Sequence, residues 1–220
     1  MSFPIIFKPK KKFKLIRLGR DYDGGYLIGD NSLQNTKTLI SFGINDDWSF
    51  EKDFIKKNSS LKTICFDDKP ILKFLFKKLI INIVFFLSHF KFKKISYLII
   101  KIFDYLLIRK RINFKQKKIS YGDLDKILTE LKDKDNIFLK IDIEGFEYRI
   151  IDEIIKNQKK LIGIIVEFHD IDYHKDLVIN FINSLDLKLI HTHPNNASVT
   201  DKNGDPTILE MTFERNEIIL

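Results

Sequence analysis

The sequence lacks the features that mark secreted, dinucleotide-binding and membrane-spanning proteins. Its single cysteine, Cys65, cannot form an internal disulfide, and residues 1–20 have neither the apolar core nor the cleavage site of a secretory signal. The three-glycine pattern of dinucleotide sites is absent. The uninterrupted apolar run at residues 83–87 is far shorter than the roughly 18 to 20 residues that cross a bilayer. We therefore expect a cytoplasmic protein that binds neither NAD nor ATP.

What is present fits one globular domain. The chain has 220 residues, of which 44% are hydrophobic and 31% are charged. This length and composition allow a sizeable core and exclude a wholly disordered chain. We expect a single domain over residues 1–220.

The positive charge is confined to two segments. Residues 1–20 carry seven Lys and Arg and no acid, and residues 70–118 carry thirteen against one acid, Asp104. The rest of the chain has eighteen bases and twenty-nine acids, a balance of −11. An acidic body with basic, apolar segments suits an anionic membrane surface better than a nucleic-acid channel, although solubility alone also explains such charge.

Short apolar runs alternate with helix-like stretches, which is typical of a parallel sheet covered by helices. The predicted strands are 38–44, 61–66, 137–143 and 161–168. The predicted helices, with apolar residues three and four apart, are 49–57, 123–132, 147–156 and 175–185. Near the end, 187–193 and 208–214 flank a turn-rich loop and predict an antiparallel hairpin at the sheet edge. The fold class is α/β.

Residues 70–118 break this alternation. They are rich in Ile, Leu, Phe and Lys, contain no glycine, and predict two helices that are apolar almost all round. We expect a helical insert that replaces part of the usual sheet edge. It could dock on an anionic membrane, form a dimer interface or cap the fold, and nucleic-acid binding is the least favoured use.

Polar residues stand where the predicted strands end, which is where open α/β sheets bind ligands. Gly43 lies at the end of the first predicted strand and permits close backbone approach. Asp67 ends the second, where an acid can accept hydrogen bonds from both hydroxyls of an adenosine ribose, or can simply lie in a solvated turn.

A third strand places three charged side chains on one face. Period-two alternation puts Lys140, Asp142 and Glu144 together, and burial of unpaired charges is costly, so they should pair or face a polar cleft. Later strands add a candidate acid/base set of four residues: Glu167, His169, His191 and His193. With Asp142 and Glu144 these could also hold a divalent metal, but no helical His pair or Cys cluster fixes a geometry, and we expect no metal.

The stretch LKIDIEGFE, residues 139–147, closely resembles the signature of the FkbM-type class I methyltransferases, which use S-adenosylmethionine. DGGY at 23–26 resembles a branch of that family. Together the matches span residues 15–69 and 119–215. Further supporting stretches are SFGI at 41–44, D-x-SFE at 47–51, IVEFH at 165–169, HPNN at 193–196 and P-x-x-LEMTF at 206–213.

The resemblance implies a Rossmann-like, mostly parallel sheet with a C-terminal antiparallel hairpin. It places the methionine part of the cofactor near Gly43 and the ribose near Asp67. The complete set of expected cofactor-binding residues is Phe42, Gly43, Asp46, Asp67, Asp142, Gly24 and Gly25. For catalysis we expect His169 as the base that deprotonates the acceptor, followed by Asp142 and His193, with Glu144 bordering the substrate.

The predicted function is O-methylation of a hydroxyl on a small molecule or glycan, with a sugar of a surface glycan or a lipid-linked intermediate favoured by family analogy. Residues 70–118 suggest a peripheral location at the inner membrane face, and a homodimer is the alternative use of that segment. Two other functions stay open: a catalytically silent membrane-associated protein that retains the fold, and a metal-dependent hydrolase.

Overall fold

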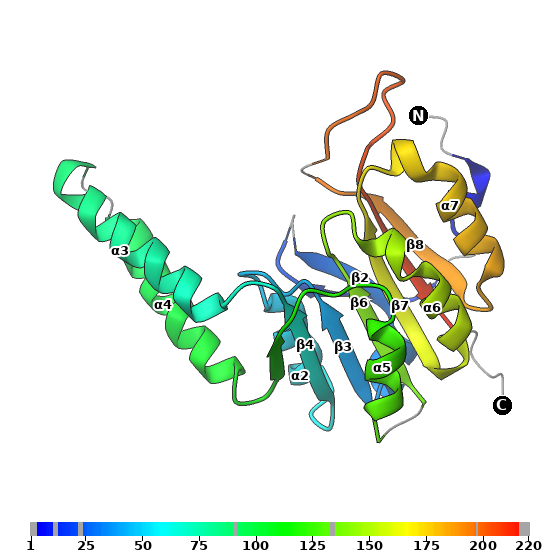
Figure 1. Ribbon diagram of the computed structural model, residues 1–220, viewed down its shortest axis with the longest axis horizontal. Coiled ribbons are helices and arrows are strands. Elements are labelled where there is room, and N and C mark those ends of the chain that lie inside the picture. Colours follow the sequence, from blue (N-terminus) through cyan, green and yellow to red (C-terminus); the bar gives the residue numbers. More distant parts are fainter. Residues whose placement is uncertain are drawn as a thin grey trace.

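The computed structural model describes residues 4–10, 13–21, 24–89, 92–132, 135–196 and 198–215, with side chains described outside 85–93. A seven-stranded sheet has the order β5-β4-β3-β6-β7-β9-β8. Its first five strands run parallel, and β9 and β8 close the edge as an antiparallel pair (Figure 1). The strands of this sheet are β3 (Thr38–Phe42), β4 (Lys62–Asp67), β5 (Asn113–Gln116), β6 (Ile137–Ile141), β7 (Leu161–Phe168), β8 (Lys188–Pro194) and β9 (Leu209–Glu214).

The helices α5 (Asp123–Glu130), α6 (Ile151–Asn157) and α7 (Ile171–Ser184) cover one face of the sheet. Residues such as Leu124, Ile154 and Phe181 pack there against the sheet residues Ile40, Leu139 and Ile164. Short 3-10 turns complete the chain on this side: η1 (Ile5–Phe7), η2 (Glu147–Arg149) and η3 (Gln158–Lys160). The apolar stripe of each helix is thereby removed from water, which stabilises this layer.

A two-stranded hairpin covers the other face. It consists of β1 (Leu15–Gly19) and β2 (Gly25–Gly29), and it is followed by α1 (Asp30–Asn35) and α2 (Ser49–Lys57). Leu18, Ile28 and Phe54 from these elements pack on Phe138 and Ile165 of the sheet. The sheet therefore lies between two layers, which explains why β3 and β6 are buried along their whole length and read as continuous apolar runs.

These observations confirm the predicted α/β class, the four buried strands and the C-terminal antiparallel hairpin. The prediction of helix throughout 70–118 is wrong at its end, because Asn113–Gln116 forms β5 and pairs in parallel with β4. Only four residues long and mostly exposed, β5 has no apolar pattern to reveal it.

The rest of that segment is a helical hairpin of α3 (Ile71–His89) and α4 (Phe92–Ile108), which extends away from the sheet (Figure 1). Its base is attached to the body by polar contacts. Trp48 Nε1 donates to Asp104 Oδ2 at 2.8 Å, and Asp104 also pairs with Lys52. Within the residues that the structure describes, no helix is both long enough and apolar enough to span a bilayer.

Candidate active site

The carboxyl ends of β3, β4, β6 and β7 meet at one edge of the sheet, and the loop after β3 makes a tight turn there. Gly43 has φ of +76°, and a Cβ on it would lie 1.6 Å from the carbonyl oxygen of Asp142. Only glycine fits both the conformation and the space. This explains the glycine after the first strand and brings β3 close to the end of β6.

A cavity of about 260 Å³ opens beside this turn. Asp67 borders it at the end of β4, and its carboxylate accepts hydrogen bonds from the backbone N–H groups of Asn45, at 2.7 Å, and Lys69, at 2.8 Å. Partial burial raises the pKa of Asp67 above its ordinary value. Apolar walls of the cavity come from Phe66, Ile119, Ile143 and Phe146.

A second cavity of about 250 Å³ lies on the side of the β1–β2 hairpin. It shares Gly43, Asn45, Asp142 and Glu144 with the first. Shared walls make the two cavities neighbours in one cleft. The second has a somewhat more polar lining. Its charged or hydrogen-bonding residues include Tyr26, Lys140, Glu167, His169 and Asn195.

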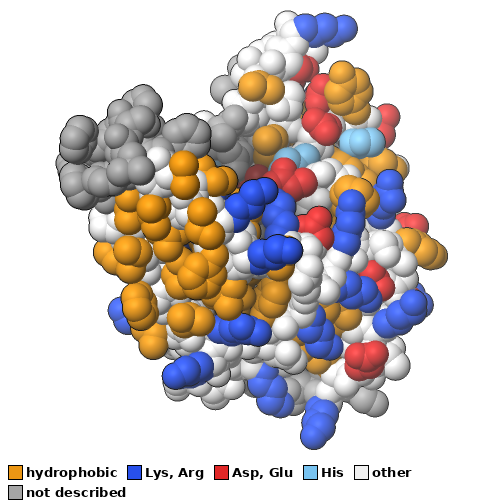
Figure 2. Space-filling view, turned by 60° about the vertical axis from the view of Figure 1, so that its left-hand side comes forward, with side chains coloured by type: hydrophobic (Ala, Val, Ile, Leu, Met, Phe, Trp, Pro, Cys, Tyr) orange, Lys and Arg blue, Asp and Glu red, His pale blue; other side chains and the backbone are white. Residues whose placement is uncertain are grey.

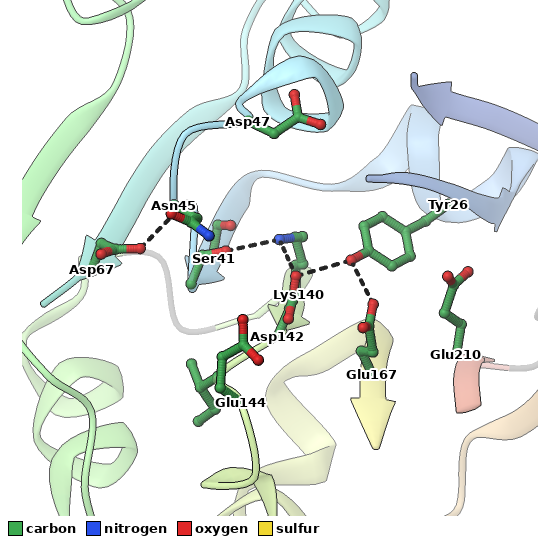
Figure 3. A network of polar contacts seen from close by, with 12 residues as sticks. Tyr26, Ser41, Asn45, Asp47, Asp67, Lys140, Asp142, Glu144, Glu167 and Glu210 are labelled. Atoms are coloured by element: carbon green, nitrogen blue, oxygen red, sulfur yellow. Dashed lines mark hydrogen bonds and ion pairs between the residues drawn. The ribbon is translucent and has the colours of Figure 1, made fainter. Parts of the chain in front are cut away.

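Tyr26 links two of these strand ends. Its hydroxyl lies 3.2 Å from Asp142 Oδ2 and 3.2 Å from Glu167 Oε2, so its one proton is shared between two carboxylates (Figure 3). Burial, together with those carboxylates, raises the pKa of Tyr26 well above its ordinary value. The phenol therefore stays protonated and acts as a donor that holds β6 and β7 side chains in place.

Lys140 supplies positive charge at the floor of the cleft. Its side chain is buried, donates to the carbonyl of Gly43 at 3.1 Å, and lies 3.7 Å from Asp142 Oδ2. Burial opposes its charge, but the carboxylates of Asp142, Glu51 and Glu167 outweigh burial and raise the pKa of Lys140. This confirms that Lys140 and Asp142 pair on one face, as the alternation of β6 predicts.

His169 is held by a buried carboxylate. Its Nδ1 lies 3.0 Å from Glu147 Oε1, and that oxygen also accepts the backbone N–H groups of Ile143 and Gly145. Its Nε2 faces Glu167, at 3.5 Å, and the exposed Glu144, at 3.6 Å. Although burial disfavours the cation, these carboxylates raise the pKa of His169 to about 9. A ring that keeps its proton at neutral pH cannot accept another, which argues against the expected role as base.

Glu167, unlike His169, can accept a proton near neutral pH. Burial, strengthened by the negative charge of Asp142, raises the pKa of Glu167 to about 7. Its Oε1 accepts a hydrogen bond from Asn195 Nδ2 at 3.1 Å, and Asn195 also donates to Glu210 Oε1 at 3.3 Å. Glu167 is therefore a buried, oriented carboxylate that changes charge near neutral pH, which suits proton transfer.

The structure brings most of the predicted site residues to this cleft. Gly43, Asp67, Asp142, Glu144 and His169 line one cavity or both. Gly24 and Asp46 line the second cavity as well. The Asp46 carboxylate, however, pairs with Lys78 at 3.0 Å and Lys101 at 3.2 Å, so it joins the helical hairpin to the loop after β3.

Three predicted residues lie elsewhere. The ring of Phe42 packs in the core on the helix-covered face, 5.5 Å from that of Phe66. His193 lines neither cavity, and its ring stacks on that of His191 at 6.2 Å. Gly25 supports the β1–β2 turn, because a Cβ there would lie 1.8 Å from the carbonyl oxygen of Arg20.

Two residues in the cleft, Tyr26 and Asn195, were not predicted as site residues. Both occur in motifs used for the resemblance, DGGY and HPNN, and this was the available signal. Neither is in the central strands, and 116 positions separate Tyr26 from Asp142. Only packing of the β1–β2 hairpin on the sheet brings its hydroxyl between the carboxylates.

Asp142, Glu144 and His169 can each place one donor atom within 4.8 Å of the others, which is the composition of a divalent-cation site. A cation there would have to displace the proton of His169, whose pKa is raised to about 9. Neutral imidazole is the form that ligates metals. The electrostatics of this cluster therefore favour an ion-paired imidazolium over a metal ligand.

The comparisons with known proteins identify the fold. No protein-family model and no curated protein matches the sequence. The alignment with the METTL16 methyltransferase domain spans 86% of this chain and 65% of that domain, at 9% sequence identity and a TM-score of 0.50. The alignment with the precorrin-6y C5,15-methyltransferase of Geobacter metallireducens GS-15 spans 84% of this chain and 86% of that protein, at 13% sequence identity and a TM-score of 0.48. The alignment with the fibrillarin pre-rRNA processing protein of Methanococcus jannaschii spans 98% of this chain and 86% of that protein, at 9% sequence identity and a TM-score of 0.47. The first of these likenesses, together with the strand order, gives the chain the Rossmann-like fold of the class I methyltransferases.

Proposed function

We propose that this protein is an S-adenosylmethionine-dependent O-methyltransferase. The observation that carries the proposal is the two-part cleft at the strand ends, with Asp67 in one part and the Tyr26, Asp142 and Glu167 network in the other. One part has the walls for a nucleoside, and the adjoining part has the carboxylates for a cation and a proton acceptor. Asp142 and Glu144, which border both parts, mark the expected place of transfer.

The residues of the first cavity fit the cofactor. The Asp67 carboxylate has about four acceptor positions, of which the N–H groups of Asn45 and Lys69 use two. The others are available to two ribose hydroxyls. Phe66, Ile119 and Phe146 offer apolar walls for an adenine ring. Asp142 supplies negative charge between the cavities, which favours a sulfonium over a phosphate.

When bound, S-adenosylmethionine supplies a methyl group on a cationic sulfur, which keeps the electron pair of the broken C–S bond as the new C–O bond forms. The chain's part is to orient the acceptor hydroxyl and to take its proton. We assign the proton to Glu167, whose pKa of about 7 leaves much of it ionised at neutral pH. Tyr26 and Asn195 fix the orientation of this carboxylate, and His169 stabilises its charge.

A hydroxyl acceptor suits this base, because a carboxylate with a pKa near neutrality removes a hydroxyl proton only as transfer proceeds. The resemblance to the FkbM-type family supports a sugar hydroxyl, on a surface glycan or a lipid-linked intermediate, as the acceptor. A lipid-linked acceptor would require a peripheral location at the inner membrane face. Self-association through the helical hairpin is the alternative use of that segment, and we expect no nucleic-acid acceptor.

The test uses S-adenosylmethionine labelled in its methyl group. We expect label to enter the lipid-linked oligosaccharide fraction of the source cells and to remain as an O-methyl sugar after acid hydrolysis. Glu167→Gln should lower this transfer by about a hundredfold or more with unchanged cofactor binding. The matched control Glu130→Gln, at an exposed site on α5, should transfer normally.

Two results would contradict the proposal. Full transfer by Glu167→Gln would remove the base assigned here. If the protein bound the cofactor but labelled no glycan, lipid or small-molecule fraction, the alternative of a catalytically silent protein that retains the fold would be favoured. If label entered RNA, the acceptor would be a nucleic acid and not a sugar.

A further inference from the structure

The helical hairpin presents an apolar face that the fold does not use. On α4, Ile100, Phe103 and Leu107 are 67%, 64% and 66% exposed, and Ile99 and Leu106 are also exposed. Their spacing of three and four residues places them on one side of the helix, where Ser96 is the one polar residue among the side chains that the structure describes. The opposite side of α4, with Leu98, Ile102, Tyr105 and Ile108, is buried in one apolar cluster with Ile71 and Leu75 of α3 and Trp48 of the body.

The second helix continues this surface. On α3, Ile71 and Leu75 are buried, while Phe76, Ile80, Ile83 and Val84 are exposed on the opposite side. In the space-filling view the hydrophobic side chains of the hairpin form one broad patch, and Lys and Arg side chains border it (Figure 2). Apolar area of this extent on both helices marks a binding surface.

Basic residues accompany the patch. Lys73 and Lys77 lie on the exposed side of α3, on the same face as Ile80 and Val84 and about two turns before them. Arg109, Lys110 and Arg111 follow the end of α4 and are exposed. Long side chains of this kind place their charge at lipid headgroups while neighbouring apolar residues enter the acyl boundary.

We infer that this face, formed by the exposed apolar residues of α3 and α4, docks the protein on an anionic lipid bilayer with both helices lying in the interface. Charge selects this occupant over a second copy of the chain. Residues 70–118 carry thirteen bases and one acid, so two such hairpins repel each other, whereas anionic headgroups attract each one. The membrane location in the proposed function rests on this docking surface. Docking itself does not require that the protein be a methyltransferase.

Docking there would place the membrane close to the cleft. Asp46, which lines the second cavity, pairs with Lys78 of α3 and Lys101 of α4. Trp48, two positions later, bonds to Asp104 of α4. The base of the hairpin is thus fixed to the loop that forms the acceptor side of the cleft, which suits an acceptor carried by a lipid.

The test is co-sedimentation of the full chain with vesicles of phosphatidylcholine, with and without phosphatidylglycerol. We expect binding to the anionic vesicles that weakens as salt is raised. The triple variant Ile100→Ser, Phe103→Ser and Leu107→Ser should bind about a hundredfold more weakly. Because these side chains are exposed, the variant should fold and should bind S-adenosylmethionine with unchanged affinity.

Three further variants serve as the control. Tyr173→Ser, Leu177→Ser and Val199→Ser remove exposed apolar side chains outside the hairpin and should leave vesicle binding unchanged. Lys73→Gln with Lys77→Gln should weaken binding to anionic vesicles about tenfold and reduce its salt dependence. This double variant separates the electrostatic part of the interaction from insertion.

Equal vesicle binding by the triple variant and the unmodified protein would overturn the inference. So would a dimer in light scattering that the triple variant converts to a monomer, with no vesicle binding by either, because a second copy would then be the occupant. Loss of vesicle binding with intact cofactor binding supports docking even if no methyl acceptor is found. Failure of docking and failure of the proposed function are therefore distinguishable.

Discussion

Replacement of Tyr26 by Phe tests the network that joins the strand ends. It deletes one hydroxyl, whose oxygen lies 3.2 Å from Asp142 Oδ2 and 3.2 Å from Glu167 Oε2. A hydrogen bond to a charged group stabilises a protein by about 1.5 to 3 kcal/mol. The hydroxyl has one proton for two carboxylates, so its two contacts together are worth about one such hydrogen bond. We therefore expect a loss of about 2 kcal/mol in the free energy of unfolding at pH 8, where Glu167 is ionised.

The loss should depend on pH in a defined direction. The Tyr26 hydroxyl stabilises the ionised form of Glu167, so its contribution is present above the pKa of about 7 and declines below it. At pH 5.5, where Glu167 is neutral, the hydroxyl still donates to Asp142, so the loss should be smaller than at pH 8 but should stay above the roughly 1 kcal/mol of a bond between neutral groups.

Urea unfolding followed by circular dichroism measures both values. A loss of about 2 kcal/mol corresponds to a midpoint shift of about 1 M. Tyr105→Phe is the matched control, because Tyr105 is equally buried in the same apolar cluster but bonds to no other described residue through its hydroxyl. Equal losses for the two variants at both pH values would refute the account of the Tyr26 network.

The other predictions concern Gly43 in the turn after β3, the protonated ring of His169, and Asp46 at the base of the helical hairpin. Gly43→Ala, whose Cβ would lie 1.6 Å from the Asp142 carbonyl, should abolish cofactor binding and lower the melting temperature sharply. Gly204→Ala, with φ of +79° and no atom within 4 Å, should cost only about 1 kcal/mol, and equal costs would contradict the packing argument. His169 has a pKa raised from 6.5 to about 9, so its contribution to stability is complete below about 6.5 and is lost as pH rises through about 9. Urea titrations should show His169→Gln lacking that decline, and an unchanged decline would exclude the ion pairs. Asp46→Asn should speed tryptic cleavage within the helical hairpin with little change in global stability, and unchanged cleavage would deny its role as a tether.

The buried strands were predictable because both faces of β3, β6 and β7 are covered, which requires continuous apolar runs. The site residues at their ends, such as Asp67 and Asp142, followed from the rule that ligands bind beyond the strand ends. Strand β5 was not predictable, because its four residues are mostly exposed and are stabilised by pairing with β4.

Contacts between distant segments set the chemistry of the cleft, and a sequence pattern does not show them. His169 looked like a base, but Glu147, held by the backbone N–H groups of Ile143 and Gly145, turns it into a cation. Its neighbour Glu167 becomes the better proton acceptor because it is buried beside Asp142. The residue types in the motifs were therefore informative, whereas their protonation states depend on packing.

The proposed function requires that this cleft bind S-adenosylmethionine through Asp67. Calorimetric titration of the purified chain with S-adenosylmethionine and S-adenosylhomocysteine measures this binding. We expect micromolar binding that Asp67→Ala abolishes and that Asp135→Ala, at an exposed aspartate before β6, leaves unchanged. Absence of binding by the folded, unmodified protein, or equal binding by the Asp67 variant, would contradict it.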